Sequence, residues 1–499
     1  MNKKVAYSIL IVAFISILIY ILIPTKFEPN NWEIKIDEIG FISSPKAIDL
    51  NQDNILDIVI GGAGSEFSAI KNGVIAINGK DGSLLWSVPA RNQVVGTPIF
   101  KDITSDGIPD VFIGGRSAIL YAINGANGDL IWEYLPTTET MDLHNDPKLL
   151  NFLNPQFIED QDGDKIEDLI IPFGGYVKAK PTDTIRPPGE LMIISTKKGT
   201  VLHHFLMPDK KETYMSPIVH KFKGDTDYSI IFGSGGEEIK GTLYCIKLKE
   251  LLQGNTEKLI VLATGEQKGF IAPPVLIDVD KDGVKDIVAN AVEGKMICIN
   301  GKTKKKIWQV NIDPKFHVST MPTPGFFTGN DDTPDFYTGL SFAPWSNNKL
   351  SMHILVDGKK GKIVSKDTIG VFQYASSSVY NFFKNKSDEV LVATNEYDIL
   401  PNSGFDNDFY MNELKIYNFE NQTFHPLRSI ALGANLGATP LITDLDKDGW
   451  IDIINCYSRD GEQLYSFKNG IIERIELKVT KKGEMRWNSY MGNNTNGIW

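Results

Sequence analysis

Short apolar runs alternate with acidic loops and tight turns along most of the chain. The run IVIGG at residues 58–62, for example, follows a loop rich in Asp and Asn. A second run then leads into an Asn-Gly turn at residues 78–79. Runs of four to eight residues with many β-branched side chains, bounded by such turns, are typical of β-strands. The pattern therefore predicts an all-β fold built from many short strands.

Two sequence motifs recur along this pattern. The first is a nine-residue acidic loop followed by an apolar run, and it occurs at residues 49–57 (DLNQDNILD), 102–110 (DITSDGIPD), 160–168 (DQDGDKIED), 278–286 (DVDKDGVKD) and 444–452 (DLDKDGWID). The second is an AINGxxG segment that ends in a tryptophan, at Trp86, Trp132 and Trp308, with weaker copies at residues 194–203 and 355–364. An internal repeat of this kind indicates a repeat architecture.

Degenerate copies of the acidic motif fill the gaps between the five clear ones. Residues 216–235 keep the flanking strands, residues 323–339 keep Asp331 and Asp335, and residues 378–394 keep only the strand pattern. Counting these copies gives eight units of roughly 50–60 residues, the period of propeller blades. Each unit reads as four strands, A to D, with the acidic loop between A and B and the Asn-Gly turn between C and D.

The repeat predicts an eight-bladed β-propeller. A seven-bladed ring is the alternative if one degenerate copy is an insertion, and an open solenoid of the same unit is another. The segment Trp32-Glu33-Ile34 precedes the first unit and resembles a strand D without its own A, B and C. It is expected to complete the last blade, after a strand C near residues 463–468, and so to close the ring and protect its edges.

The N-terminus carries a hydrophobic segment. Lys3 and Lys4 precede an uncharged stretch of 19 residues, Val5–Ile23, which is long enough to cross a bilayer as a helix. The positive-inside rule favours a cytoplasmic N-terminus. The sequence therefore predicts a transmembrane signal-anchor in residues 1–26, a propeller in 27–480 on the periplasmic or extracellular side, and a C-terminal tail in 481–499. A cleaved signal peptide is the alternative, and it too would export the protein.

Composition narrows the functional classes. The chain has 62 acidic and 51 basic residues, a formal net charge of −11, which argues against nucleic-acid binding. The three cysteines, Cys245, Cys298 and Cys456, match no metal or haem-attachment spacing and cannot all pair. We therefore expect the cysteines to be buried and free.

The acidic loops have the chemistry of Ca²⁺ sites. Oxygen side chains stand at loop positions 1, 3, 5 and 9, and Ca²⁺ binds six to eight oxygen ligands. We expect up to five structural Ca²⁺ ions, with weaker binding in the first two loops, where Asn51 and Thr104 replace acids. The predicted ligands are Asp49, Asn51, Asp53 and Asp57; Asp102, Thr104, Asp106 and Asp110; Asp160, Asp162, Asp164 and Asp168; Asp278, Asp280, Asp282 and Asp286; and Asp444, Asp446, Asp448 and Asp452.

These loops and turns resemble known repeats. The D-x-D-x-D-G-x-x-D loop that runs into a Gly-Gly strand is similar to the FG-GAP repeat of integrin α-subunit propellers and to the related VCBS repeat. The AINGxxG…W half is similar to the quinoprotein (PQQ-like) repeat. The resemblance implies Ca²⁺ in the acidic loops and partners on the opposite face. The chain lacks the adjacent cysteine pair and the CxxCH motif of quinoprotein dehydrogenases, so PQQ is not expected as a cofactor.

Long insertions fall in the expected B–C and D–A loops, on the face opposite the acidic loops. Long loops on a rigid scaffold usually carry function. The candidate ligand-binding residues there are Tyr176, Arg186, Phe342, Trp345, Tyr397, Phe405 and Tyr410. Since no GxSxG or HExxH motif is present, we expect a binding, adhesion or scaffold module for a protein or glycan. A calcium-dependent polysaccharide lyase and an envelope assembly factor are the alternatives.

Overall fold

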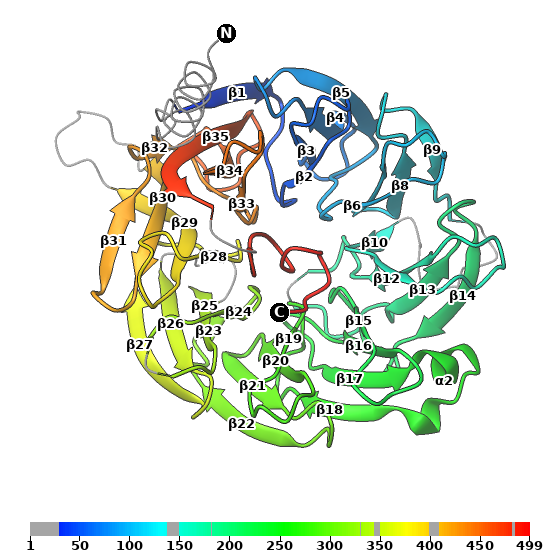
Figure 1. Ribbon diagram of the computed structural model, residues 1–499. Coiled ribbons are helices and arrows are strands. Elements are labelled where there is room, and N and C mark those ends of the chain that lie inside the picture. The colour runs from blue at the N-terminus through cyan, green and yellow to red at the C-terminus, as the bar shows by residue number, and fades with distance from the viewer. Residues whose placement is uncertain are drawn as a thin grey trace, which may run out of the picture.

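The protein forms a ring of eight β-sheets around a central axis (Figure 1). The computed structural model describes residues 29–136, 149–180, 182–329, 331–343, 350–398, 409–481 and 485–499. Each sheet is built on a path of four antiparallel strands, which we call A to D from the centre outward. The predicted eight-bladed propeller is confirmed, and the seven-bladed and open-solenoid alternatives are wrong.

The first four blades follow one another along the chain. Blade 1 is β2 (Lys46–Ile48), β3 (Asp57–Gly61), β4 (Ile70–Ile77) and β5 (Leu84–Ala90); blade 2 is β6 (Ile99–Lys101), β7 (Asp110–Gly115), β8 (Ile119–Ile123) and β9 (Leu130–Glu133); blade 3 is β10 (Asn151–Phe152), β11 (Gln156–Ile158), β12 (Asp168–Gly174), β13 (Glu190–Ile194) and β14 (Val201–Leu206); blade 4 is β15 (Ile218–His220), β16 (Ser229–Gly233), β17 (Thr242–Lys247) and β18 (Ile260–Thr264). A short helix α2 (Leu248–Leu252) and a 3₁₀ turn η3 (Thr256–Lys258) connect β17 to β18.

The remaining blades repeat the pattern. Blade 5 is β19 (Val275–Ile277), β20 (Asp286–Ala291), β21 (Lys295–Ile299) and β22 (Lys306–Asn311); blade 6 is β23 (Phe316–His317), β24 (Thr323–Gly325), β25 (Asp335–Phe342), β26 (Ser351–Asp357) and β27 (Lys362–Thr368); blade 7 is β28 (Ser378–Tyr380), β29 (Glu389–Asp398), β30 (Phe409–Asn418), β31 (Thr423–Pro426) and β32 (Ala431–Leu432); blade 8 is β33 (Leu441–Thr443), β34 (Trp450–Ser458), β35 (Asn469–Thr480) and β1 (Trp32–Asp37).

The burial of each strand follows its distance from the rim. Strand B of blade 1, β3, is buried along its whole length, because neighbouring sheets pack on both of its faces. The outer strand β27 instead alternates between exposed and half-buried residues. The core is therefore not a single centre but a series of apolar layers between blades, such as the one that joins Val59 and Trp86 of blade 1 to Ile113 of blade 2. The three cysteines are buried and free, as expected.

Strands from near the two ends of the described chain meet in blade 8. Strand β1 pairs antiparallel with β35, from Trp32 opposite Arg474 to Asp37 opposite Asn469, and the two lie side by side in Figure 1. The predicted role of Trp32-Glu33-Ile34 as the closing strand D is confirmed. The predicted position of strand C is wrong, because residues 459–468 form a polar loop. The carboxylate of Asp460 holds that loop by accepting bonds from the Glu462 N–H (3.1 Å) and the Ser466 hydroxyl (2.6 Å).

Tryptophans of strand D lock each of four blades onto the next. Each indole N–H donates to a backbone carbonyl in the C–D turn of the following blade: Trp32 to Gly79 (2.9 Å), Trp86 to Gly125 (2.8 Å), Trp132 to Thr196 (2.9 Å) and Trp308 to Gly358 (2.7 Å). A glycine with positive φ in the same turn lies under the indole ring, and a Cβ on Gly128 would stand 2.9 Å from Trp86. The tryptophan of the AINGxxG…W motif thus contacts the glycine-containing turn of the following blade.

Residues 485–499 occupy the centre of the ring, where Figure 1 shows them as the red coil. The tail bonds the inner strands of several blades: the N–H groups of Val379, Ile442 and Leu276 donate to carbonyls of Trp487, Asn488 and Gly497, each at 2.8 Å. The buried Lys46 ammonium of blade 1 donates to the Ser489 hydroxyl (2.6 Å) and to the Tyr490 carbonyl (2.8 Å). The tail therefore ties the inner strands to one another.

The predicted membrane segment cannot be located in this structure. Val5–Ile23 belongs to residues 1–28, which lie outside the described residues. Among the described residues, no helix has the length and apolar character needed to cross a bilayer.

Candidate functional site

The A–B loops have a common anchor at their ninth position. In blade 5 the Asp286 carboxylate accepts bonds from the N–H groups of Val279 and Gly301, both at 2.9 Å, and so fixes the A–B loop to the C–D turn. The same pair of backbone bonds holds Asp57, Asp110, Asp168 and Asp335 in their blades. Burial raises the pKa of Asp57 to about 6, against the lowering effect of these bonds. The ninth acid therefore has a structural task that the motif alone did not reveal.

Blade 7 has the same anchor in a form that the sequence pattern concealed. Glu389 accepts bonds from the Phe382 N–H (2.8 Å) and from the Asn418 side-chain amide (3.0 Å). The interpretation that residues 378–394 keep only the strand pattern is therefore wrong. An aspartate at this position, such as Asp286, bonds the backbone of the C–D turn. The longer Glu389 instead bonds the side chain of Asn418.

Three A–B loops bring carboxylates close enough to hold a metal ion. Ligand oxygens lie within 4.8 Å of one another in three groups: Asp160, Asp162 and Asp168 in blade 3; Asp278, Asp280 and Asp282 in blade 5; and Asp444, Asp446 and Asp452 in blade 8, where Asp446 and Asp448 also meet Glu476. Asp164 and Asp286 lie in the loops of blades 3 and 5 but outside these groups, and the predicted ligands of blades 1 and 2 lie in loops where no group of three acids meets this distance among the described residues. In blade 1, for example, Asp49 accepts the N–H groups of Gln52 (2.7 Å) and Asn54 (3.0 Å).

Unsatisfied oxygens show that a cation fits these groups. The Oδ2 atom of Asp164 and the Oδ1 atoms of Asp278 and Asp446 are shielded from solvent, and none has a hydrogen-bond donor among the described residues. In blade 8, however, the other oxygen of Asp446 is paired with the Arg474 guanidinium at 2.7 Å, whereas the carboxylates of Asp164 and Asp278 have no such buried ion pair among the described residues. A buried carboxylate oxygen without a partner is costly unless a positive charge compensates it. The loops of blades 3 and 5 therefore have the donor set and the unmet charge of a site for a hard cation.

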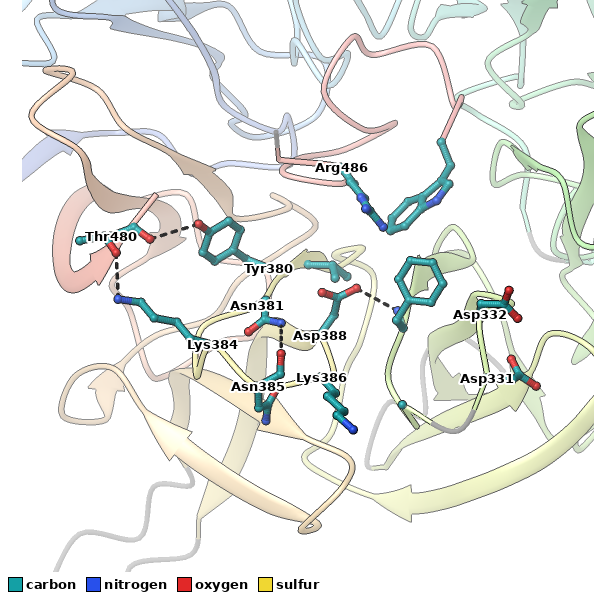
Figure 2. Close-up of a pocket in the computed structure, with 14 residues that line it drawn as sticks. Asp331, Asp332, Tyr380, Asn381, Lys384, Asn385, Lys386, Asp388, Thr480 and Arg486 are labelled. Atoms are coloured by element: carbon teal, nitrogen blue, oxygen red, sulfur yellow. Dashed lines mark hydrogen bonds between the residues drawn. The ribbon is translucent and has the colours of Figure 1, made fainter. Parts of the chain in front are cut away.

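A cleft of about 820 Å³ opens on the acidic-loop face between blades 6 and 7 (Figure 2). Its walls are the A–B loops of these two blades and the C-terminal tail. The Arg486 guanidinium lies over the rings of Phe326 (5.3 Å) and Trp499 (5.8 Å). Lys384 donates to the Thr480 hydroxyl at 2.8 Å. The cleft therefore combines aromatic surface with charges of both signs, since Asp331, Asp332 and Asp388 line it beside Lys384, Lys386 and Arg486.

Asp388 joins the two sides of this cleft. Its carboxylate accepts the Phe326 N–H at 2.9 Å, and its own N–H donates to the Phe326 carbonyl at 2.9 Å. Burial raises the pKa of Asp388, although the Phe326 bond and the nearby Arg486 charge oppose the rise. Lys384 and Lys386 are exposed on the same loop. Sequence reasoning missed this cleft, because it is formed by three segments far apart in the chain.

Among the described ligand-face candidates, the structure places Tyr176 and Arg186 in the B–C loop of blade 3, but it places Phe342, Tyr397 and Tyr410 near the ends of strands β25, β29 and β30. Tyr176 packs against the apolar layer of blades 2 and 3, and Phe342 contacts Phe316 edge-on at 5.4 Å. Tyr397 and Tyr410 contact each other at 5.0 Å. The other two candidates, Trp345 and Phe405, lie outside the described residues.

Arg186 is held by an ion pair on the same face. Its Nη1 atom lies 3.0 Å from Glu212 Oε1 and 3.1 Å from Glu212 Oε2, and the Tyr214 hydroxyl donates to the same carboxylate at 3.1 Å. The Arg186 side chain is only 10% exposed. The ion pair and the burial thus indicate that the Arg186 guanidinium stabilises the loop.

One contact spans the ring on this face. The Tyr374 hydroxyl, from the connection between blades 6 and 7, donates to Glu237 Oε1 of blade 4 at 2.6 Å. Burial raises the pKa of Glu237, against the lowering effect of this bond. The sequence signal was weak, namely a glycine-rich B–C loop at residues 233–241. The bond links blades that are not neighbours.

A family comparison supports the repeat type. Residues 55–153 match the family model described as outer membrane protein assembly factor BamB. The match covers most of blade 1, blade 2 and the start of blade 3. No curated protein matches the chain.

Solved structures share the fold at low sequence identity. A europium-containing methanol dehydrogenase superposes with a TM-score of 0.55 and 10% identity over 89% of this chain and 92% of that one. The exotype rhamnogalacturonan lyase YesX superposes with a TM-score of 0.54 and 13% identity, over 89% of this chain and 76% of that one. Quinohemoprotein alcohol dehydrogenase from Comamonas testosteroni superposes with a TM-score of 0.51 and 12% identity, over 91% of this chain and 78% of that one. The sequence match and these likenesses together support one structural assignment: the chain is an eight-bladed, PQQ-like β-propeller.

Proposed function

We propose that this chain is a non-enzymatic scaffold that acts in the assembly of envelope proteins. The observation that carries the proposal is the match of residues 55–153 to the family model of an outer membrane protein assembly factor. The structure supports a scaffold, because its conspicuous buried charges serve the fold: Glu212 binds Arg186, and Asp286 binds backbone N–H groups.

In this proposal the cleft of Figure 2 binds a segment of the partner protein. Aromatic rings beside an arginine are typical of protein-binding hot spots. Phe326, Trp499 and Arg486 provide such a surface at one side of the cleft. The exposed Lys384 and Lys386, together with the acids Asp331 and Asp332 of the opposite loop, would favour a partner segment that carries charges of both signs. A protein or glycan ligand on the B–C and D–A face, as the sequence predicts, stays a prediction.

We further propose that the loops of blades 3 and 5 bind Ca²⁺. Asp160, Asp162 and Asp168 would hold one ion, and Asp278, Asp280 and Asp282 another. The unsatisfied oxygens of Asp164 and Asp278 support this assignment. The bound ion would supply positive charge that holds the carboxylates of the A–B loop together. The similarity of these loops to the FG-GAP and VCBS repeats is part of the same proposal.

Val5–Ile23 is proposed to anchor the protein, with the propeller on the exported side. A single-pass anchor would hold the scaffold close to the membrane proteins it serves. Polysaccharide cleavage remains the second candidate function. Such a reaction would require a basic residue near a groove, for which the sequence offers Arg186 or His144. However, Arg186 is paired with Glu212 and only 10% exposed, and His144 lies outside the described residues.

Site-specific photo-crosslinking of the full chain in native membranes tests the scaffold role. A photoreactive residue at position 386 should capture one dominant envelope protein, and the same group at the outer-strand residue Leu84, which is 55% exposed, should not. A third probe at Ile185, 93% exposed in the B–C loop of blade 3, tests the opposite face. Capture only at position 185 would move the binding site to that face. If none of the three positions captured a protein, the scaffold proposal would be wrong.

Chelation tests the calcium assignment separately. Removal of Ca²⁺ from the full chain should lower its melting temperature, and adding Ca²⁺ back should restore it, because an ion that binds only the folded state stabilises that state. An unchanged melting temperature would exclude structural Ca²⁺.

A further inference from the structure

The A–B loop of blade 8 already contains a cation supplied by the chain. Arg474 of β35 is fully buried, and its Nε donates to Asp452 Oδ1 and its Nη2 to Asp446 Oδ2, both at 2.7 Å. Asp446 and Asp452 are two of the carboxylates expected to bind the metal ion of this loop. The guanidinium therefore stands among the oxygens that a metal ion would need.

The remaining bonds of Arg474 leave it little freedom to move away. Nη2 also lies 3.4 Å from Glu476 Oε1, and Nη1 donates to the Gly79 carbonyl of blade 1 at 3.3 Å. The rigid fork of an arginine suits such a set of fixed acceptors. Withdrawing the guanidinium would strip the buried Asp452 of its Arg474 bond and break a contact between the first and last blades.

Blade 4 shows the same substitution with a lysine. The Lys247 ammonium at the end of β17 contacts the Asp225 carboxylate and donates to the Ser229 hydroxyl at 2.9 Å. Ser229 occupies the ninth loop position, and it pairs with Lys247 in the sheet. This loop has lost most of its acids, and the ammonium pairs with one of the two that remain, Asp225, while the Asp227 carboxylate accepts the N–H groups of Tyr228 and Lys249.

Blades 3 and 5 have neutral residues at the place of Lys247. Ser195 donates to Asp162 Oδ2 at 3.1 Å, and Asn300 donates to Asp280 Oδ2 at 2.7 Å. Lys198 also reaches Asp162, but its side chain is 54% exposed and free to swing into solvent. Within the part of the chain that the structure describes, the carboxylates of these two loops therefore have no buried counter-ion.

We propose that Arg474 replaces the metal ion of blade 8, so that Ca²⁺ binds the loops of blades 3 and 5 but not residues 444–452. This inference rests on the proposed calcium binding and restricts it. The sequence DLDKDGWID has acids at all four expected positions, yet a divalent ion would have to share its buried carboxylates with a fixed positive charge. Ring closure at blade 8 is then independent of Ca²⁺.

Two matched substitutions test the assignment in the full chain. Asp282→Asn and Asp448→Asn change the fifth position of the loops in blades 5 and 8, where both side chains are exposed and each accepts a backbone N–H at 2.8 Å. Bound Ca²⁺ is counted by native mass spectrometry. We expect Asp282→Asn to lose one ion and Asp448→Asn to lose none.

The outcomes separate this inference from the proposal on which it rests. Loss of an ion in Asp448→Asn would overturn the role given to Arg474. A wild-type chain without any Ca²⁺ would instead refute calcium binding itself. Arg474→Gln provides a second test: the folded variant should bind one ion more than the wild type, and an unchanged count would contradict the inference. The comparison of Asp282→Asn with Asp448→Asn tests the inference even if Arg474→Gln fails to fold.

Discussion

At the scale of single residues, the contact between Trp86 and Gly128 shows how one blade recognises the next. The indole covers the Cα of a glycine whose φ is +79°, and its N–H donates to the Gly125 carbonyl at 2.8 Å. A side chain at position 128 would meet the ring at 2.9 Å. Both the backbone conformation and the space therefore require glycine.

Gly128→Ala should lower the free energy of unfolding by about 2–4 kcal/mol, the sum of left-handed backbone strain and overpacking. Gly254→Ala is the matched control, because Gly254 has φ +71° but nothing within 4 Å of the place that a methyl group would take. Gly254→Ala should lower the free energy of unfolding only by the cost of the left-handed backbone strain, about 1–2 kcal/mol. Urea unfolding measures both. Equal losses in the two variants would show that the tryptophan does not restrict this position.

Lys46 is a residue whose charge state should affect stability. Its side chain is buried against the C-terminal tail, and its bonds to Ser489 and Tyr490 involve no carboxylate. Burial lowers the pKa of Lys46 to about 7. The ammonium is thus disfavoured by desolvation and held only by neutral acceptors.

The free energy of unfolding should rise between pH 7 and pH 10 because of Lys46. In this window the unfolded chain keeps a proton, since a free lysine has a pKa near 10.4, while the folded chain has released it. The expected slope is about 1.4 kcal/mol per pH unit for one proton. Denaturant titrations of wild type and Lys46→Met measure the difference. Identical slopes in both proteins would contradict the assignment.

At the scale of elements, the A–B loop has two separable parts. The ninth acid fixes the loop to the C–D turn through backbone bonds, as Asp286 does with Val279 and Gly301. The earlier acids, such as Asp282, point to the proposed ion. The first part is present in blades 1, 2, 3, 5 and 6, and it does not depend on whether a metal ion binds.

Asp286→Asn should therefore destabilise the protein even in excess chelator, by about 2–3 kcal/mol, because two buried N–H groups lose a charged acceptor. Asp282→Asn should change the stability by less than about 0.5 kcal/mol under the same conditions, since asparagine can still accept the Val284 N–H. Denaturant unfolding with chelator compares them. Equal effects would mean that the ninth acid has no separate structural role.

The strand pattern and turn chemistry predicted the elements well, because apolar runs and Asn-Gly turns are local signals. Other features were not visible in the sequence. Arg474 stands on a strand 22 residues beyond its partner Asp452, and Lys247 stands 18 residues beyond Ser229. Which charge enters which loop is decided by sheet register, and a motif within one loop does not contain that information.

At the scale of the whole molecule, the ring is closed by one short strand. Trp32 and Ile34 of β1 pack against the apolar layer between blades 8 and 1. The eight units and the closing strand were predictable, since they rest on a repeat and its single incomplete copy. The cleft between blades 6 and 7 was not, because it depends on the path of the tail across the ring.

Replacing both Trp32 and Ile34 by alanine should loosen blade 8 alone. We expect amide exchange in β35 to accelerate at least about tenfold while β16, in blade 4, keeps its protection, because local openings follow local packing. Lys35→Ala, on the other face of the same strand and 52% exposed, is the control and should change neither. Hydrogen exchange followed by mass spectrometry measures both strands in each variant. Uniform acceleration around the ring would show that the blades do not open independently.

The shared blade also sets an order in time. Strand β1 leaves the ribosome before its partner β35, which follows roughly 440 residues later in the chain. At 5–20 residues per second this interval is on the order of 20–90 s. Throughout synthesis the nascent chain carries a strand whose hydrogen-bonding edge has no partner. The protein therefore depends on whatever shields that edge until the final segment emerges.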